Sequence, residues 1–293
     1  MGAVEALVAG ELDGPVDPRV TAFAEAIAAR HGTASRAVLF YGSCLRSAEL
    51  DGQMLDFYLI VSSYHAAYGG GWKALANRLL PPNVFPATHE GLAAKYAVLS
   101  EADFKRETGL GARDVSTMAR FAQPARLVWK ADRAAEGITL AAVAQASRSL
   151  LALTVPTLER GIADDPEAAW RAAFRLTYRC ELRAERAARP DAIVDADPAR
   201  YAALGRLVAA EAPRLGSPSV GSGWAAWARR GRRRQVMKLI KASTTFAGGI
   251  DYLAWKINRH AGTDIAIRPW QRRWPLLGAM ALLPRLMAKG AVR

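Results

Sequence analysis

The sequence predicts an α+β fold, in which a mixed sheet with helices forms the N-terminal part and helices alone form the rest. Two observations predict it. Short apolar runs that end at turn residues, as strands do, recur up to about residue 130. From about Thr139 onward, alanine-, leucine- and arginine-rich segments with helical spacing replace them. The 293 residues suffice for two modest domains, so we predict an N-terminal domain over 1–133, a helical domain over 134–262 and a basic amphipathic tail over 263–293.

The elements of the N-terminal part follow from local patterns. Residues 18–31 place apolar side chains on one helical face before His31-Gly32 ends the helix. A second helix is expected from about residue 72 to residue 80, where Pro81-Pro82 stops it, and its apolar side chains, Trp72 included, are expected in the core. Strands are expected at 37–41, 55–61, 94–99 and 125–129, the first two as neighbours.

In the helical part we expect helices over 139–153, 165–188, 198–212 and 233–258. Asp165-Pro166 and Asp197-Pro198 each place a capping acid directly before a proline at the first helical position. A segment rich in glycine, serine and proline, 216–223, is expected to be a loop between helices.

Charge narrows the range of partners. The net charge is +13 and the pI about 10.2, which favours nucleic acid, nucleotides or anionic lipid. The two cysteines form no C-x-x-C pair, which fits a reducing compartment. We expect neither a signal peptide nor a run of the ~20 apolar residues that a membrane span needs. The sequence therefore predicts a cytoplasmic protein that touches a membrane surface without crossing it.

Two neighbouring segments carry the clearest chemical signal. The strand at 37–41 ends at Gly42-Ser43, a turn whose backbone N–H groups can hold phosphate oxygens. The next apolar strand carries Asp56, whose carboxylate can hold Mg²⁺ against the same phosphates. Nucleotidyltransferases build their active sites in this way. The alternative for Gly42-Ser43 is an ordinary turn from a strand into a helix.

Asp56 is flanked by apolar residues on both sides. An ionised carboxylate in such a strand is costly unless it is paired or bound to a metal, which favours metal ligation over a structural role. Side chains two positions apart share a face of a strand, and the residue two positions on is Tyr58, so a second metal ligand must come from elsewhere.

The order of motifs along the chain resembles one family, the mitochondrial-type CDP-diacylglycerol synthases. These are the translocator assembly and maintenance family of phosphatidate cytidylyltransferases. The segments that carry the resemblance are Tyr41-Gly42-Ser43, Met54-Leu55-Asp56-Phe57, Lys95-Tyr96-Ala97-Val98, 119–125, 176–183 and Ile267-Arg268-Pro269. Three departures stand out. Cys44 replaces the second glycine of a G-S-G turn, Glu181 stands where the family tends to have aspartate, and a lysine before Pro124 is missing, with Arg126 a candidate to supply its charge.

The resemblance implies a role for each matching residue. Asp56 and Glu181 would hold Mg²⁺, and Asp56 and Lys95 would form the catalytic pair. The nucleotide would be held by Tyr41, Gly42, Ser43, Arg120 and Gln123. Structural alternatives remain: Glu181 and Lys95 as solvated charges, and Arg120 and Gln123 as residues that cap and pack a short helix.

Other reactive side chains are assigned no chemistry. His65 and His89 lack a second ligand at metal-like spacing and are expected in loops. Cys44 has no supporting His/Asp pair for nucleophilic catalysis and is interpreted as a small packing residue.

Basic segments with tryptophan predict contact with a membrane. Residues 229–234 could bind nucleic acid, but Trp224 and Trp227 precede them, and interfacial helices combine basic and tryptophan-rich faces. The tail repeats the pattern with Arg268, Trp270, Arg272, Arg273 and Trp274. The alternative is a solvated basic face packed on the helical domain.

The expected function is transfer of CMP from CTP to phosphatidate, which yields CDP-diacylglycerol and pyrophosphate at the inner face of the membrane. The expected partners are CTP, phosphatidate and an anionic membrane surface, with Mg²⁺ as cofactor and no nucleic acid. Two alternatives remain open: a nucleotidyltransferase that acts on RNA or another acceptor, and a catalytically silent binding protein. The oligomeric state is also open, with a homo-oligomer as one option.

Overall fold

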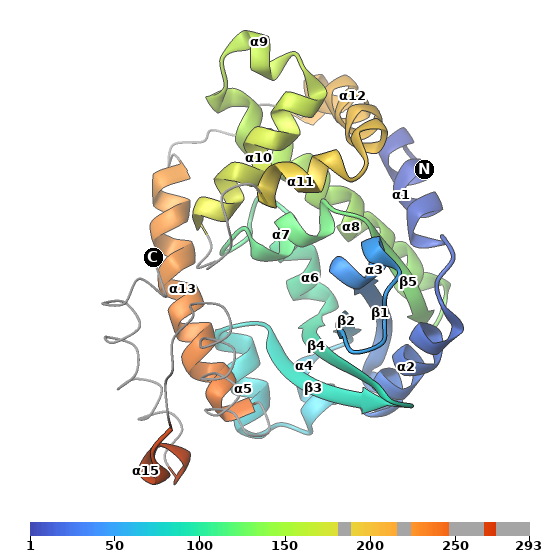
Figure 1. Ribbon diagram of the computed structural model, residues 1–293, viewed down its shortest axis with the longest axis vertical. Helices are drawn as coiled ribbons and strands as arrows, with labels where there is room; N and C mark the ends of the chain where they lie inside the picture. Colours follow the sequence, from blue (N-terminus) through green and yellow to red (C-terminus); the bar gives the residue numbers. More distant parts are fainter. Residues whose placement is uncertain (181–188, 216–223, 246–266, 274–293) are drawn as a thin grey trace.

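The computed structural model describes residues 1–180, 189–215, 224–245 and 267–273 (Figure 1). Its centre is a five-stranded sheet in the order β3-β4-β2-β1-β5, where β2 and β4 are parallel and the other pairs antiparallel. The strands are β1 (Ser35–Tyr41), β2 (Met54–Val61), β3 (Asn83–His89), β4 (Leu92–Ser100) and β5 (Ala125–Lys130). A mixed sheet with helices, followed by a helical C-terminal region, confirms the predicted fold class.

Helices surround the sheet and continue beyond it. Those of the first half are α1 (Ala3–Leu12), α2 (Pro18–Ala29), α3 (Ser43–Ser47), α4 (Tyr64–Tyr68), α5 (Gly71–Leu79), α6 (Glu101–Thr108) and α7 (Ser116–Phe121). Those of the second half are α8 (Arg133–Thr154), α9 (Arg160–Ala163), α10 (Pro166–Cys180), α11 (Arg189–Asp195), α12 (Pro198–Leu215), α13 (Trp224–Thr245) and α15 (Pro269–Arg273).

The two faces of the sheet have different coverings, because alternate residues of a strand point to opposite sides. On one face, Phe57 and the other odd-numbered residues of β2 join a core with Phe23 and Ile27 of α2. On the other face, Tyr58 and Ile60 join a larger core with residues of α6, α7, α8 and the helices that follow. Asp56 belongs to this second face, at the end of the strand where the core stops.

Helix α8 joins the sheet to the helical region. It contacts β1 and β5 on one side and α10 and α12 on the other. Residues 133–157 are long and apolar enough to span a membrane by composition, but about two thirds of the most apolar stretch, 67%, is buried inside the protein. One such helix is weak evidence for a span. The predicted division at residue 133 falls at the first residue of α8.

Buried arginines attach α12 and α1 to the sheet side of the molecule. Arg200 pairs with Glu11 at 2.5 Å and donates a hydrogen bond to the carbonyl oxygen of Ala122 at 3.1 Å. Arg148 of α8 pairs with Glu5 and Glu211 in the same way. Because Ala122 directly follows α7, the first arginine also restrains that helix.

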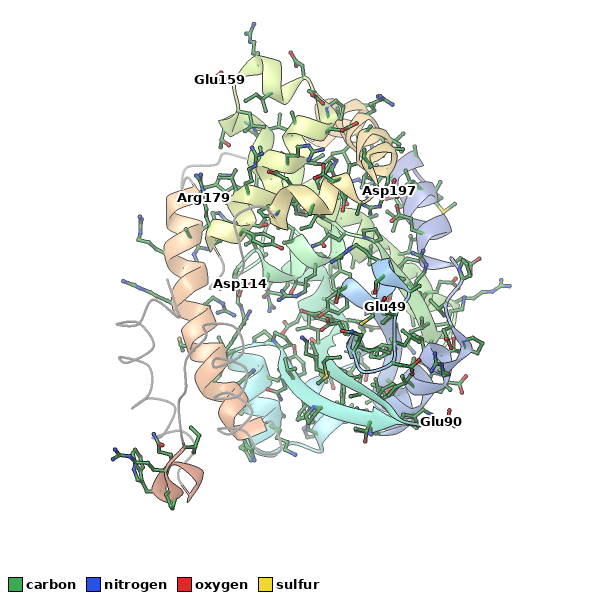
Figure 2. The ribbon with its side chains drawn as sticks, in the orientation of Figure 1. Glu49, Glu90, Asp114, Glu159, Arg179 and Asp197 are labelled. Atoms are coloured by element: carbon green, nitrogen blue, oxygen red, sulfur yellow. The ribbon has the colours of Figure 1, made fainter. Side chains whose placement is uncertain are left out.

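Helix α13 docks through a buried ion pair with the loop before α7 (Figure 2). Asp114 is 2% exposed, and its Oδ2 lies 2.6 Å from Lys238 Nζ and 3.2 Å from Arg234 Nε. Further along α13, Lys241 donates hydrogen bonds to the carbonyl oxygens of Leu80 and Pro82. The positive charge of this helix is therefore used in part to hold the protein together.

The apolar helix after the triple glycine was predicted in the core, and this prediction is wrong. Trp72, Leu75 and Leu79 of α5 are 53%, 58% and 67% exposed. The helix instead buries a polar residue, Asn77, whose Nδ2 donates to the carbonyl oxygen of Val98 at 2.9 Å. The apolar composition of this segment indicated a helix, but it could not say whether the apolar side chains meet protein or solvent.

The opposite error concerns the tryptophans expected at a membrane. Trp227 is buried in the core, and Trp224 Nε1 donates to the carbonyl oxygen of Leu153 in α8 at 3.1 Å. Helix α13 begins nine residues earlier than expected, and these tryptophans form its inward face. Residues 246–258, the rest of the predicted helix, lie outside the described residues.

Candidate functional site

The glycine turn that follows β1 and the Asp56 carboxylate of β2 lie together at one end of these two strands. Gly42, with φ +96° and ψ −157°, joins β1 to α3 in a conformation that is essentially restricted to glycine. A Cβ atom added to Gly42 would lie 3.0 Å from Oδ2 of Asp56. The backbone of the turn therefore approaches the carboxylate closely, and glycine is required on both counts. Ser43 follows as the exposed first residue of α3.

Asp56 and Lys95 form an ion pair across parallel strands. They are direct partners in the register of β2 and β4, and Lys95 Nζ lies 3.1 Å from Asp56 Oδ1. The two side chains are 18% and 33% exposed respectively. Both side chains therefore lie at the edge of the core, where a molecule in solution can reach them. The register of these strands brings together two predicted site residues that are far apart in the sequence.

Tyr41 faces Asp56 from the neighbouring strand, since the two are paired in the register of β1 and β2. Its ring packs on Tyr58 and Phe121, with centroids 5.4 and 5.8 Å away. Burial and the adjacent Asp56 carboxylate raise the pKa of Tyr41 well above its usual range, and the nearby Arg120 only partly opposes this. The phenol therefore stays neutral and can orient a polar group but not accept its proton.

Helix α7 brings Arg120 and Gln123 beside this end of the sheet. Arg120 Nη1 donates to the carbonyl oxygen of Ser116 at 2.7 Å, and Gln123 Nε2 donates to that of Ala119 at 2.9 Å. These bonds are the ones expected of residues that cap and pack a short helix. Arg120 in addition interacts with Tyr41, so it also belongs to the surroundings of Asp56.

Arg46 is a cationic residue of this region that the sequence analysis did not identify. It is exposed on α3, and its Nη1 lies 3.4 Å from Oε1 of Gln123. This contact joins the helix after the glycine turn to the end of α7. Its position three residues after Ser43 is the signal that could have indicated it, because a helix returns to nearly the same face after three or four residues.

Cys44 plays the packing role that was predicted for it. The side chain is buried, and its Sγ lies 3.7 Å from the carbonyl oxygen of Met54. Burial and the Asp56 charge raise the pKa of the thiol. A thiol held protonated is a poor nucleophile.

Asp56 fits a Mg²⁺ ion that would take most of its other ligands from water and from the phosphate oxygens of a bound molecule. Mg²⁺ usually keeps several waters and is held by one or two carboxylates together with phosphate oxygens. Asp56 offers one partly exposed carboxylate beside the glycine turn. Within the described part of the chain, no group of three or more His, Cys, Asp or Glu side chains could hold a metal. Glu181, the predicted second ligand, lies outside the described residues.

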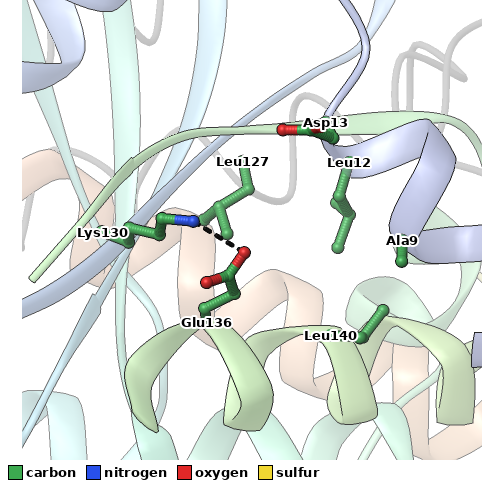
Figure 3. A pocket seen from close by; sticks show the side chains of 7 residues that line it. All are labelled: Ala9, Leu12, Asp13, Leu127, Lys130, Glu136 and Leu140. Atoms are coloured by element: carbon green, nitrogen blue, oxygen red, sulfur yellow. Dashed lines mark ion pairs between the residues drawn. The ribbon is translucent and has the colours of Figure 1, made fainter. Parts of the chain in front are cut away.

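Two other features are separate from this site. Arg126 pairs with Phe40 in the register of β1 and β5 and lies against Gly14, so it is on the opposite face of the sheet from Asp56 and does not replace the missing lysine. The hollow between α1, β5 and α8 contains the 2.6 Å ion pair of Lys130 and Glu136 (Figure 3). None of the predicted site residues lines it.

The predicted membrane residues are described only in part. Arg268 and Trp270 are exposed at α15. Arg272 and Arg273 end this helix, but their side chains, like Trp274, lie outside what the structure describes.

Replacing Gly42 by alanine tests the turn. The Cβ would occupy a glycine-only conformation and press on Asp56, so Gly42→Ala should lower the free energy of unfolding by about 1–3 kcal/mol and disturb the carboxylate. The matched control is Gly10→Ala in α1, where an added Cβ meets no atom within 4 Å and should be neutral or stabilising. Denaturant unfolding of both variants measures the difference, and equal stability would contradict the strained turn.

A scan of the sequence against protein-family models found no matching family, and a search of the curated proteins found no match.

Proposed function

We propose that this protein is a Mg²⁺-dependent phosphatidate cytidylyltransferase, which transfers CMP from CTP to phosphatidate and releases pyrophosphate. The observation that carries the proposal is the contact of three parts: the Gly42 turn, the Asp56 carboxylate and the Lys95 ammonium group. Together they supply a backbone surface for phosphate, a ligand for a hard cation and a positive charge. Phosphoryl and nucleotidyl transfer depend on positioning and charge neutralisation, and these groups suit both tasks.

The proposed roles follow from where the residues lie. The backbone of the Gly42-Ser43 turn would hold the triphosphate, with Arg120 and Gln123 at the nucleotide side. Asp56 would hold Mg²⁺, which supplies neutralising charge on the phosphate oxygens when bound. Lys95 would offset the charge of two anionic substrates that approach each other.

In this reaction an oxygen of the lipid phosphate forms a bond to the α-phosphorus of CTP. The bond between the α-phosphorus and the bridging oxygen breaks, and pyrophosphate leaves with that electron pair. The lipid phosphate is already ionised at neutral pH, so the reaction needs no general base. A Tyr41 phenol that stays neutral is consistent with this, because its hydroxyl would orient an oxygen without taking a proton.

The choice of a lipid acceptor is supported by the order of motifs and by the basic chain. The segments around Tyr41, Asp56 and Lys95 resemble the lipid-specific family in sequence order, and the net charge of +13 favours anionic surfaces. Exposed Arg268 and Trp270 are suited to an interface. We accordingly propose that the protein acts at the cytoplasmic face of the membrane.

The test is a transfer assay on the purified full chain. With labelled CTP, Mg²⁺ and phosphatidate in mixed micelles, we expect labelled CDP-diacylglycerol and an equal amount of pyrophosphate. Parallel reactions replace phosphatidate by tRNA or by glycerol 3-phosphate, and CTP by ATP, GTP or UTP. Transfer to tRNA or to the soluble phosphate, with none to the lipid, would replace the acceptor in this proposal. Absence of any transfer would reject it.

A further inference from the structure

We propose that the exposed apolar face of α5 is a second membrane-docking surface, on the N-terminal sheet region and separate from the basic tail. Its occupant is an anionic lipid surface. This surface, called the α5 face below, consists of Trp72, Leu75 and Leu79. It extends the proposed function and rests on it only in placing the acceptor in a membrane.

The geometry of α5 is the first observation. Spacings of three and four residues put the three side chains on one side of the helix, and each is more than half exposed. On the opposite side Asn77 is completely buried and holds the helix to β4 through the carbonyl oxygen of Val98. The helix is thus fixed with its apolar side outward. Contiguous exposed apolar groups on a folded protein mark an interaction site.

The charge around this face indicates which partner covers it. The chain has no Asp or Glu between Asp56 and Glu90, and none between Glu211 and Asp251, so α5, β3 and α13 carry no acid. Lys73 and Arg78 are exposed on α5. Apolar side chains with a tryptophan, bordered by cations and free of acids, match the boundary between acyl chains and anionic headgroups. Nucleic acid would leave the leucines unused.

The position of α13 and α15 is the third observation. Lys241 of α13 contacts the carbonyl oxygens of Leu80 and Pro82 at the end of α5, and Met237, one turn before it, is 55% exposed. In Figure 1, α5, the C-terminal end of α13 and α15 all lie toward the same end of the long axis. Trp270 of α15 is also exposed. Elements that carry exposed apolar residues therefore lie toward one end of the molecule.

The decisive experiment measures vesicle binding of the full chain. The vesicles are phosphatidylcholine alone or phosphatidylcholine with phosphatidylserine, an anionic lipid that is not the proposed acceptor. Leu75→Ser/Leu79→Ser is compared with Ile138→Ser/Ile162→Ser, a matched pair of isoleucines that are 38% and 41% exposed elsewhere. We expect the α5 variant to lose at least about tenfold in binding to anionic vesicles, while the matched pair and wild type bind alike. Equal binding by all three would overturn the proposal.

A second variant separates a loss of docking from a loss of folding. Lys73→Glu/Arg78→Glu leaves the apolar residues in place and reverses two exposed charges, so it should weaken binding to anionic vesicles and leave binding to neutral vesicles unchanged. No loss on anionic vesicles would count against the lipid surface. Sedimentation equilibrium examines the other occupant: a wild-type dimer that Leu75→Ser/Leu79→Ser dissociates, with vesicle binding intact, would assign the α5 face to a second copy of the chain.

The transfer assay separates this proposal from the proposed function. With a short-chain phosphatidate below its micellar concentration, Leu75→Ser/Leu79→Ser should transfer CMP like wild type, and with phosphatidate in vesicles it should be slower. If wild type transfers no CMP but Leu75→Ser/Leu79→Ser binds vesicles more weakly than wild type, the docking surface stands and the enzymatic function fails. If wild type transfers CMP and the α5 substitutions leave vesicle binding unchanged, the enzymatic function stands and the docking surface fails.

Discussion

Asp56→Asn is expected to lower the rate of CMP transfer by at least about a thousandfold. The amide keeps the size of the side chain, but it removes the negative charge that would hold Mg²⁺ beside the Gly42 turn and that pairs with Lys95 at 3.1 Å. Because both residues are partly exposed, the ion pair itself contributes little to folding. Stability should therefore change far less than activity.

Two controls make this result specific. Asp51→Asn changes an exposed carboxylate in the segment just before β2, one that pairs only at the surface with Arg19, and it should leave transfer unchanged. Circular dichroism and denaturant unfolding establish that Asp56→Asn is folded. Transfer by this variant within tenfold of wild type would remove Asp56 from the proposed active site.

Asp114→Ala is expected to have the largest effect on stability, lowering the free energy of unfolding by about 3–5 kcal/mol. The carboxylate is almost fully buried, and its Oδ2 contacts Lys238 and Arg234 of α13. Its Oδ1 also accepts the backbone N–H of Ser116 at the start of α7. Without this carboxylate, Lys238 and Arg234 would remain at the interface between α13 and the rest of the protein with no negative charge from Asp114 to pair with them. Guanidinium unfolding at neutral pH measures the loss, with Asp51→Ala as the control, for which a change below about 1 kcal/mol is expected.

The same residue predicts a stability loss in acid. Burial opposes ionisation of Asp114, but the charges of Lys238 and Arg234 and the hydrogen bonds from Lys238 and Ser116 outweigh it and lower its pKa to about 2. A carboxyl group whose pKa is lower in the folded state stabilises the fold above the unfolded value, near 4, and this contribution disappears as pH falls to 2. It amounts to about 2–3 kcal/mol. Thermal unfolding from pH 5 to pH 2 should show a smaller decline for Asp114→Ala than for wild type. Parallel declines would contradict the ion pair.

Strands with a clear local signal were predicted well. The strands expected at 37–41, 55–61, 94–99 and 125–129 are present as β1, β2, β4 and β5, within two residues at either end. Apolar runs between turn residues suffice for this. Strand β3 was missed because Pro86 lies inside it. A proline cannot donate to the ladder, so it argues against a strand in general, but β3 is an edge strand, where proline is tolerated.

The candidate site was predicted as a set of residues and not as an arrangement. Gly42 and Asp56 were identified from turn chemistry and from the cost of a charge in an apolar strand. The contact of Asp56 with Lys95 depends on the register of the parallel pair β2 and β4, which local sequence does not encode. Arg46 was not predicted as a site residue, because its contact with Gln123 joins elements that lie far apart in the chain.

Local sequence is enough to predict four of the five strands, the glycine turn and the acid carried by the next strand, because strand propensity and turn chemistry depend on neighbouring residues. It does not establish which face of a helix is covered. Trp72 of α5 and Trp227 of α13 both lie on amphipathic helices, yet one is exposed and the other buried. The difference arises from what each helix packs against: Asn77 turns the polar side of α5 to the sheet, and Asp114 together with the core under α8 turns α13 inward. Long-range packing of this kind is set by contacts between distant parts of the chain, and it decides which apolar side chains remain exposed.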